Sequence, residues 1–302
     1  MAVKLSIVIA TYNRGPALRR TLDSLAQMSV PSDEWELVVV NNNSTDCTAD
    51  IFAQFALSHP HITAKITDEK RQGLSYARNR GIECSQGPYI ALIDDDVEVN
   101  EVFASAYIDF FDRHPSAAAA GGKVTPLYET GKPEWISAYT ERPIAGTLDM
   151  GGKIKIFRRG YPTGANMAFR RSELLKIGEF DTSLGRTGTA PMGGEEKDMF
   201  ARFSAAGYDT YYVPDARVLH IIPESKLSPA YFSRVAEMCG RSERVRTLSR
   251  SRSAYAAALA GEAVKWCATL VLSAAHLIAG HPSRAKALIT MRCGVSRGLT
   301  GK

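Results

Sequence analysis

The sequence has few cysteines, and their spacing gives them no structural role. Its 302 residues include five, an odd number, with no CxxC pair and no histidine at metal-site spacing, which argues against a disulfide framework or a zinc knuckle. With 45% hydrophobic and 23% charged residues, the composition excludes disordered, collagenous and disulfide-rich classes. We expect a globular chain in a reducing compartment, folded as one large domain or two smaller ones.

The sequence also lacks a clear targeting or membrane-spanning segment. The apolar run near the N-terminus, residues 5–10, is too short for a secretory signal. The longest apolar stretch, residues 254–279, is interrupted by Glu262, Lys265 and His276, so the pattern does not favour a spanning helix.

Common glycine-rich site motifs are missing as well. No GxGxxG follows an apolar run, and GxxxxGK and GxSxG are absent, so dinucleotide, P-loop and serine-hydrolase sites gain no support. There is no internal repeat and no low-complexity linker.

The first hundred residues alternate apolar β-rich runs with amphipathic stretches. Strands are expected over 3–10, 35–40, 62–66 and 89–93, and helices over 16–28, 45–57 and 75–84. Continuous apolar runs predict strands buried on both faces of a parallel sheet. Right-handed crossovers bring the carboxyl ends of such strands to one edge, where ligands bind.

The chain after residue 115 has weaker periodicity and more glycine and proline. A small-residue strand is expected at 117–122, a helix at 195–206, and a strand at 208–213 that Pro214 ends. A helical tail is expected from Ser228 onward.

Three consecutive aspartates follow the expected strand at 89–93. Asp94, Asp95 and Asp96 place negative charge at the end of a buried strand, which is costly unless a cation neutralises it. A few oxygen ligands suit Mg²⁺ or Mn²⁺, which bind through one or two carboxylates together with substrate phosphates. The alternative is a surface turn that happens to be acidic.

A second acidic cluster, Glu195, Glu196 and Asp198, follows a double glycine. One of these carboxylates could act as a general base for an acceptor hydroxyl, although acids in a first helical turn are also favoured by the helix dipole. His220 follows another strand-like run, and a lone histidine is usually structural.

These segments together resemble the family 2 glycosyltransferases, bacterial inverting enzymes with the GT-A fold. Residues 6–14 resemble the nucleotide-binding start of that family, 38–46 its second loop, 73–81 its third, and 92–96 its DxD metal motif. The acceptor-side segment and the catalytic ED motif are matched by residues 164–170 with 178–181, and by 194–198. The resemblance covers roughly residues 3–222 and implies an α/β fold with a mixed sheet and flanking helices.

The resemblance also implies roles for individual residues. Glu196 takes the place of the catalytic base, with Glu195 and Asp198 as neighbours able to share the duty, while Asp96 and His220 take the place of ligands to Mn²⁺ or Mg²⁺. The donor nucleotide-sugar is assigned to Thr11, Tyr12, Arg14, Asn41, Arg78, Asp94 and Asp95. The acceptor is assigned to Gly164 and Asn166, with Trp135 as an aromatic platform that could equally be local packing.

Two positions depart from the family pattern. The second loop begins with Asn41 where the family has an aspartate that contacts the base, which affects base selectivity. Glu196 stands where the ED motif has aspartate and reaches one methylene further, so Glu195 stays an alternative base.

The charge is unevenly distributed between a catalytic region and a tail. The boundaries expected are 1–227 for the GT-A domain, with a donor half at 1–115 and an acceptor half at 116–227, and 228–302 for a basic helical tail. That tail has twelve Lys and Arg against three acids, whereas the whole chain has a net charge of only +5. A basic tail suggests an anionic partner such as a membrane surface.

One helix of the tail has a narrow polar stripe on an otherwise apolar surface. The stripe consists of Glu262, Lys265, Thr269, Ser273, His276 and Gly280. Such a helix can be packed as a cap on the catalytic domain, buried in a homodimer contact, or laid in the interface of a membrane, and the basic residues on both sides favour the membrane.

The expected function is transfer of a sugar, by default from a UDP-sugar, to a hydroxyl of a lipid-linked or polysaccharide acceptor. The resemblance implies inversion and a role in assembling the cell envelope, in the cytoplasm on the inner face of the plasma membrane. The alternatives are a nucleotidyltransferase or a non-catalytic nucleotide-sugar binder on the same fold. A nucleic-acid binder is disfavoured because aromatic stacking residues and known motifs are absent.

Overall fold

The computed structural model describes residues 2–187 and 193–301. The chain forms two compact units. Unit 1 comprises Met1–Pro126, Thr147–Thr182 and Glu195–Ile221, and unit 2 comprises Leu127–Gly146, Ser183–Gly194 and Ile222–Lys302.

Unit 1 is built on a mixed sheet with the strand order β3-β2-β1-β4-β8-β6-β9-β5 and β7 paired to β9. Its strands are β1 (Leu5–Thr11), β2 (Trp35–Asn41), β3 (Thr63–Asp68), β4 (Tyr89–Ile93), β5 (Val97–Val99), β6 (Ala119–Tyr128), β7 (Lys155–Ile156), β8 (Asn166–Arg170) and β9 (Thr210–Ile222). Its helices are α1 (Gly15–Leu25), α2 (Thr48–Ser58), α3 (Leu74–Cys84), α4 (Phe103–Arg113), α6 (Arg171–Ile177) and α7 (Glu195–Ala205).

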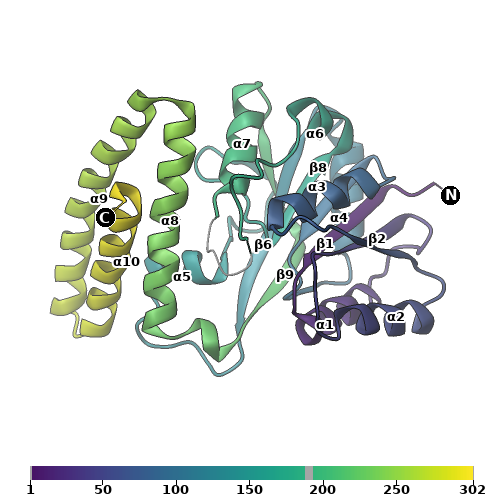
Figure 1. Cartoon of the computed structure of the whole chain (residues 1–302), viewed down its shortest axis with the longest axis horizontal. Helices are drawn as coiled ribbons and strands as arrows, with labels where there is room; N and C mark the ends of the chain where they lie inside the picture. Colours follow the sequence, from purple (N-terminus) through teal and green to yellow (C-terminus); the bar gives the residue numbers. More distant parts are fainter. Residues whose placement is uncertain (1, 188–192, 302) are drawn as a thin grey trace. The chain divides into compact units, whose positions relative to one another are not determined.

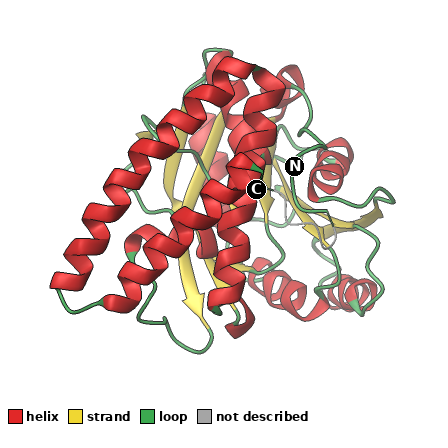
Figure 2. Ribbon diagram, turned by 60° about the vertical axis from the view of Figure 1, so that its left-hand side comes forward, coloured by secondary structure: helices red, strands yellow, loops and turns green. Residues whose placement is uncertain are grey.

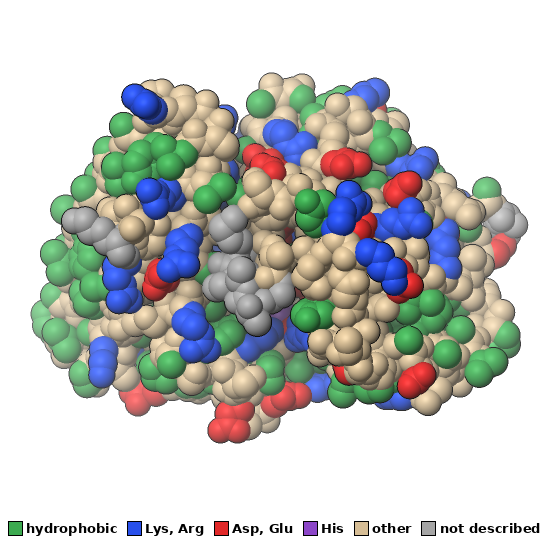
Figure 3. Space-filling view, viewed as in Figure 1, with side chains coloured by type: hydrophobic (Ala, Val, Ile, Leu, Met, Phe, Trp, Pro, Cys, Tyr) green, Lys and Arg blue, Asp and Glu red, His purple; other side chains and the backbone are tan. Residues whose placement is uncertain are grey.

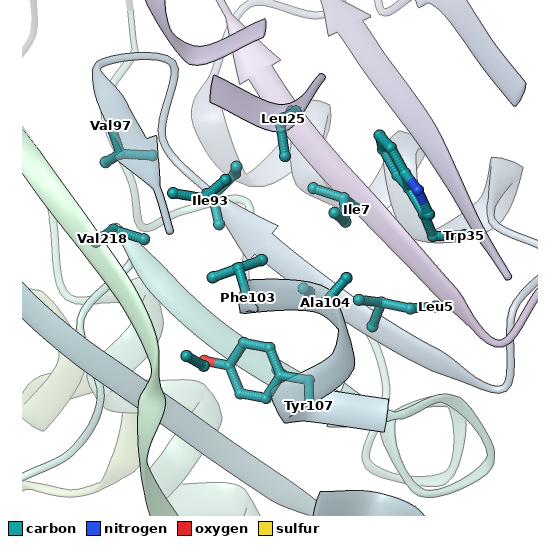
Figure 4. Packing of buried hydrophobic residues seen from close by; sticks show 14 of the residues in the cluster. Leu5, Ile7, Leu25, Trp35, Ile93, Val97, Phe103, Ala104, Tyr107 and Val218 are labelled. Atoms are coloured by element: carbon teal, nitrogen blue, oxygen red, sulfur yellow. The ribbon is translucent and has the colours of Figure 1, made fainter. Parts of the chain in front are cut away.

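The strands β3, β2, β1 and β4 are parallel, as the sequence predicted. The side chains of β2, β1 and β4 alternate between two apolar clusters, one on each face of the sheet, whereas the edge strand β3 has only exposed and half-buried residues. Leu5 and Ile7 of β1 point into the cluster shown in Figure 4, together with Trp35 of β2, whereas Val8 points into the other. Helices cover both faces (Figure 2), and Figure 1 shows α1 and α2 on the side opposite α3. The α/β class with flanking helices is confirmed.

The second half of the sheet is antiparallel, with β8 between β4 and β6. One expectation is wrong here: β9 does not stop at Pro214 but continues to Ile222, so that the strand has 13 residues in all. Pro214 is tolerated because it lies between the residues that pair with β7, ending at Tyr212, and those that pair with β5, starting at Val218. A residue without an N–H fits at such a gap in the ladder.

Unit 2 is helical and contains α5 (Ala138–Ala145), a 3₁₀ turn η1 (Glu224–Lys226), α8 (Pro229–Arg250), α9 (Arg252–Ile278) and α10 (Pro282–Thr300). Its apolar core joins α5, α8 and α10 through residues such as Ile144, Phe232 and Ala287. Ser228 caps α8 by accepting a hydrogen bond from the Tyr231 amide at 3.2 Å. The C-terminal helical region expected from the sequence is thereby confirmed.

Helices α8 and α10 approach so closely that glycine is required at their contact. A Cβ atom on Gly298 would lie 2.1 Å from the Glu237 carbonyl oxygen, and one on Gly240 would lie 2.1 Å from the Val295 carbonyl oxygen. Both neighbours are backbone atoms, so a side chain at either position would push the helices apart.

Replacing Gly298 by alanine is expected to lower the free energy of unfolding by about 1–3 kcal/mol, the usual cost of overpacking. The matched control is Gly261→Ala on α9, where a new Cβ would meet no atom within 4 Å and alanine favours the helix by about 1 kcal/mol. Thermal unfolding of both variants checks this. Equal melting temperatures for the two would mean that the contact tolerates a wider spacing.

Candidate active site

The loops that follow β1 and β2 are bonded to one another at the carboxyl edge of the sheet. The Asn13 amide donates to Ser44 Oγ at 3.0 Å, and Asn13 Oδ1 accepts from the Thr45 amide at 2.7 Å. Asp46 accepts from the Gly15 amide at 2.9 Å. The first and second loops therefore form one frame, as expected for parallel strands that end at a common edge.

Arg14 from the first loop pairs with two of the three aspartates that follow β4. Its guanidinium lies 2.8 Å from Asp95 Oδ1 and 2.6 Å from Asp96 Oδ2. Thr11 donates to the other oxygen of Asp95 at 2.8 Å. Asp95 and Asp96 are 4% and 2% exposed, so their charges depend on these partners.

Burial sets the titration of this cluster. It raises the pKa of Asp95 to about 6, an effect that Arg14 opposes and the neighbouring carboxylate of Asp96 increases. Burial alone would lower the pKa of Arg14, but Asp95 and Asp96 outweigh it and raise that pKa. The guanidinium therefore stays charged, and the acidic cluster holds a cation in its immediate contact.

His220 and Asp96 come together although they are far apart in the sequence. His220 lies on β9, which pairs with β5 directly after the aspartates, and its Nε2 is 3.3 Å from Asp96 Oδ1. Both side chains are buried. An imidazole nitrogen and a carboxylate oxygen thus face each other beside Arg14.

This pair is suited to a divalent cation that also binds substrate. Across residues 2–187 and 193–301, no group of three or more His, Cys, Asp and Glu side chains is arranged to hold a metal ion. Mg²⁺ and Mn²⁺ commonly use only one or two protein ligands and take the rest from phosphates and water. Asp96 and His220 fit that incomplete donor set, and Arg14 contributes a further positive charge beside Asp96.

The buried side chain of Arg78 on α3 contacts three carboxylates. Its guanidinium lies 2.8 Å from Glu195, 3.3 Å from Asp94 and 3.9 Å from Glu196. Burial alone would lower the pKa of Arg78, but Glu195, Glu196 and Asp94 together raise it. This one cation therefore links the aspartates after β4 to the start of α7.

The three acids at the start of α7 have different surroundings. Glu195 is buried against Arg78, and Asp198 accepts a hydrogen bond from Arg202 Nε one turn along the helix at 2.9 Å. Glu196 is 21% exposed, and its Oε1 accepts a hydrogen bond from the Gly164 amide at 3.1 Å. A Cβ on Gly164 would lie 2.4 Å from that oxygen, so glycine is needed for this approach.

Replacing Arg78 by glutamine is expected to lower the free energy of unfolding by about 3–5 kcal/mol, because Glu195 would be left as an uncompensated buried charge. The control is Arg80→Gln on the same helix, whose partner Glu83 is 70% exposed and whose loss should cost at most about 1 kcal/mol. Urea unfolding measures both. A cost for Arg78→Gln as small as that of the control would mean that water reaches Glu195.

The side chain of Asn41 is engaged by the next strand. Its Nδ2 donates to Asp68 Oδ1 at 3.0 Å, and its Oδ1 accepts from the Ser44 amide at 2.9 Å. Asp68, at the end of β3, supplies a carboxylate next to the position where the family pattern has one. Sequence analysis missed Asp68, although its place at the end of an expected strand was the available signal. Tyr12 follows Thr11, the β1 residue that pairs with Asn41, and is 40% exposed.

Two residues assigned to the acceptor have structural contacts. Asn166 is fully buried, and its amide bonds to Tyr107 and to the Lys123 and Ala216 carbonyls, so its assignment to the acceptor stays a prediction. Trp135 belongs to unit 2, where its ring lies 5.0 Å from that of Phe232.

Comparison with known proteins agrees with this architecture. Residues 6–178 match the model of glycosyl transferase family 2. The chain is 31% identical over 232 residues to the glucosyl-dolichyl phosphate glucuronosyltransferase of Haloferax volcanii, covering 72% of this chain and 69% of that protein. It is 28% identical over 301 residues to the succinoglycan biosynthesis protein ExoM of Rhizobium meliloti, covering 98% and 93%.

A solved structure is similar in fold. The mannosyltransferase PcManGT from Pyrobaculum calidifontis, in complex with GDP-Man and Mn²⁺, superposes with a TM-score of 0.64 at 18% identity, covering 100% of this chain and 88% of that one. The family model spans more than half of the sequence, and so the chain belongs to glycosyl transferase family 2.

Proposed function

We propose that this protein is a metal-dependent, inverting glycosyltransferase that moves a sugar from a nucleoside diphosphate to an acceptor hydroxyl. The observation that supports this best is the pair of sites linked by Arg78: an acidic cluster suited to a cation, and a partly exposed carboxylate, Glu196. A non-catalytic binder has no need of the second site.

Glu196 is assigned as the catalytic base. Glu195 is the buried counterion of Arg78, and Asp198 is paired with Arg202 at 2.9 Å. Glu196 is as exposed as Asp198, and the Arg78 guanidinium lies 3.9 Å from it, so it is the least tightly paired of the three. It takes the proton of the acceptor hydroxyl while the hydroxyl oxygen bonds to the anomeric carbon and the nucleoside diphosphate departs. A single displacement of this kind inverts the configuration of that carbon.

Asp96 and His220 are assigned to the metal, Mn²⁺ or Mg²⁺. When bound, such an ion supplies positive charge that stabilises the departing diphosphate. Arg14 adds a second cation at the same edge of the sheet, and Asp95 holds Arg14 in place through their 2.8 Å contact. Preorganised charges of this kind stabilise charge that develops as the bond breaks.

The nucleoside is assigned to the frame of the first and second loops. Thr11, Tyr12 and Arg14 line its first loop, and Asn41 with Asp68 forms an amide and carboxylate pair on its second. A carboxylate beside an amide can accept from a base N–H and also contact its carbonyl oxygen. A UDP-sugar is the default donor, and this pair is where a different base would be selected.

The acceptor is assigned to the cell envelope, as a lipid-linked or polysaccharide hydroxyl. The names of the two similar proteins, one acting on a glucosyl-dolichyl phosphate and one in succinoglycan biosynthesis, support this. We accordingly place the protein in the cytoplasm on the inner face of the plasma membrane.

Thermal stabilisation against a panel of nucleoside diphosphates and nucleotide-sugars, each with and without Mn²⁺, tests the proposal. A ligand that binds the native state raises the melting temperature. At a hundredfold excess over Kd, it adds about 2.7 kcal/mol to the free energy of unfolding. We expect a metal-dependent rise for one base. Release of pyrophosphate in place of nucleoside diphosphate during turnover would point to a nucleotidyltransferase, and no response to any nucleotide would contradict the donor site.

A further inference from the structure

Helix α9 buries polar side chains and exposes apolar ones, the reverse of a helix on the surface of a water-soluble protein. Its buried residues are polar, namely Glu262, Thr269 and Ser273. The side chains that it exposes are apolar and include Leu259, Val264, Leu270, Val271, Leu277 and Ile278, which are 36% to 90% exposed. Figure 3 shows hydrophobic side chains gathered over the left edge of the molecule, where Figure 1 draws α9, with Lys and Arg side chains beside them.

The buried stripe attaches α9 to α10 through polar contacts. Arg292 of α10 lies 2.8 Å from Glu262, and Ser296 donates to the other oxygen of Glu262 at 2.9 Å. Trp266 donates its indole N–H to Ser296 at 2.9 Å. Because the carboxylate of Glu262 is matched by Arg292, α9 is held without using its apolar face.

The segment that contains α9 and α10 is basic. Between residues 252 and 300 the sequence has six Lys and Arg and one acid, and that acid is the buried Glu262. A second copy of the same surface would place like charges together, which is unfavourable. A surface that carries negative charge and accepts apolar side chains is complementary, and an anionic bilayer has both properties.

A groove of about 750 Å³ between α9 and α10 is lined by Trp266, Lys286, Ile289 and Arg297 among others. Tryptophan and basic side chains next to apolar ones are the residues that occupy the headgroup layer of a membrane. Lys286 and Arg297 are exposed and bring positive charge to this groove, where Arg297 also donates to Ser233 Oγ at 3.4 Å.

We infer that the exposed face of α9 inserts into the headgroup and acyl boundary of an anionic membrane, with α9 lying in the membrane plane. By length and composition, α9 is able to cross a bilayer, and only 17% of its most apolar window is buried. An in-plane position is favoured because α10 remains attached along α9 through Arg292 and carries three further basic residues that hydrocarbon would exclude. This inference does not depend on the proposed chemistry.

Flotation of the full chain with vesicles tests the inference. We expect it to float with phosphatidylcholine vesicles that contain about one third phosphatidylglycerol, and at least about tenfold less when Val264 and Val271 are both replaced by glutamate. These valines are 71% and 70% exposed, so the double variant should keep the wild-type melting temperature. The matched control is Leu57→Glu with Leu175→Glu, which adds the same charge at exposed positions of unit 1 and should float like wild type.

A second variant measures the electrostatic contribution to vesicle binding. Lys286→Gln with Arg297→Gln is expected to weaken binding by about 30-fold, from about 1 kcal/mol for each basic residue near an anionic surface. The inference is overturned if the wild-type chain stays unbound, or if the Val264 and Val271 variant floats as wild type does. It is also overturned if light scattering shows a dimer that this variant dissociates and that does not bind vesicles, because the face would then belong to a second copy.

Discussion

Replacing Glu196 by glutamine is expected to lower the rate of sugar transfer by roughly 10² to 10⁴ while donor affinity stays near wild type. The amide keeps the shape of the side chain and can still contact the Gly164 amide region, but it cannot take a proton. Release of nucleoside diphosphate under saturating donor measures the rate, and the melting-temperature response to donor measures the affinity.

Three comparisons make this result specific to Glu196. Glu83→Gln alters an exposed glutamate of α3 and should leave the rate unchanged. Asp198→Asn should lower it only slightly, because Asp198 contacts Arg202. Glu195→Gln should lower stability, since it breaks the buried contact with Arg78. Normal turnover by Glu196→Gln would move the base to Glu195 or Asp198.

The Asp96→Ala variant is expected to lose the Mn²⁺-dependent part of donor binding. In wild type, donor with Mn²⁺ at a hundredfold excess over Kd should add about 2.7 kcal/mol of stability, and in the variant Mn²⁺ should add nothing to the effect of donor alone. The cause is the loss of the carboxylate that faces His220. Thermal unfolding with donor, with and without Mn²⁺, gives both quantities.

Glu98→Ala is the matched control for Asp96. Glu98 lies two residues further along, on β5, and its partner Arg20 is 40% exposed, so its loss should leave the metal response intact. If Asp96→Ala still responded to Mn²⁺ as wild type does, the ion would be held elsewhere, and the assignment of Asp96 and His220 would be wrong.

The donor half of the fold was predictable from sequence because its signals are local. Each apolar run such as Leu37–Val40 is long enough to be buried on both faces, and each is followed by a polar loop. Parallel pairing then fixes where those loops meet. The expected strands and helices up to residue 93 accordingly agree with the structure within a few residues.

The contacts that sequence could not provide are those between distant positions. Arg78 and Glu195 are 117 residues apart, and no local pattern indicates that one guanidinium meets three carboxylates. Asn166 belongs to a motif that resembles an acceptor segment, yet its amide is consumed by the core. The extension of β9 past Pro214 depends on its pairing with β5, a strand more than 100 residues earlier in the chain.

The sequence predicted the polar stripe of α9, but not that this stripe would face the protein. Periodicity shows that polar and apolar residues occupy different faces of a helix. It cannot show which of them faces α10. That information lies in Arg292 and Ser296, residues of another helix that satisfy Glu262.

Glu262 and its polar neighbours attach α9 to α10. The outward side chains of α9 therefore contribute little to the stability of unit 2. Those positions can therefore vary in size and hydrophobicity with small effects on folding. Under the proposed membrane insertion, adaptation to a different lipid composition and selection for a stable fold would act on separate sets of residues of one helix.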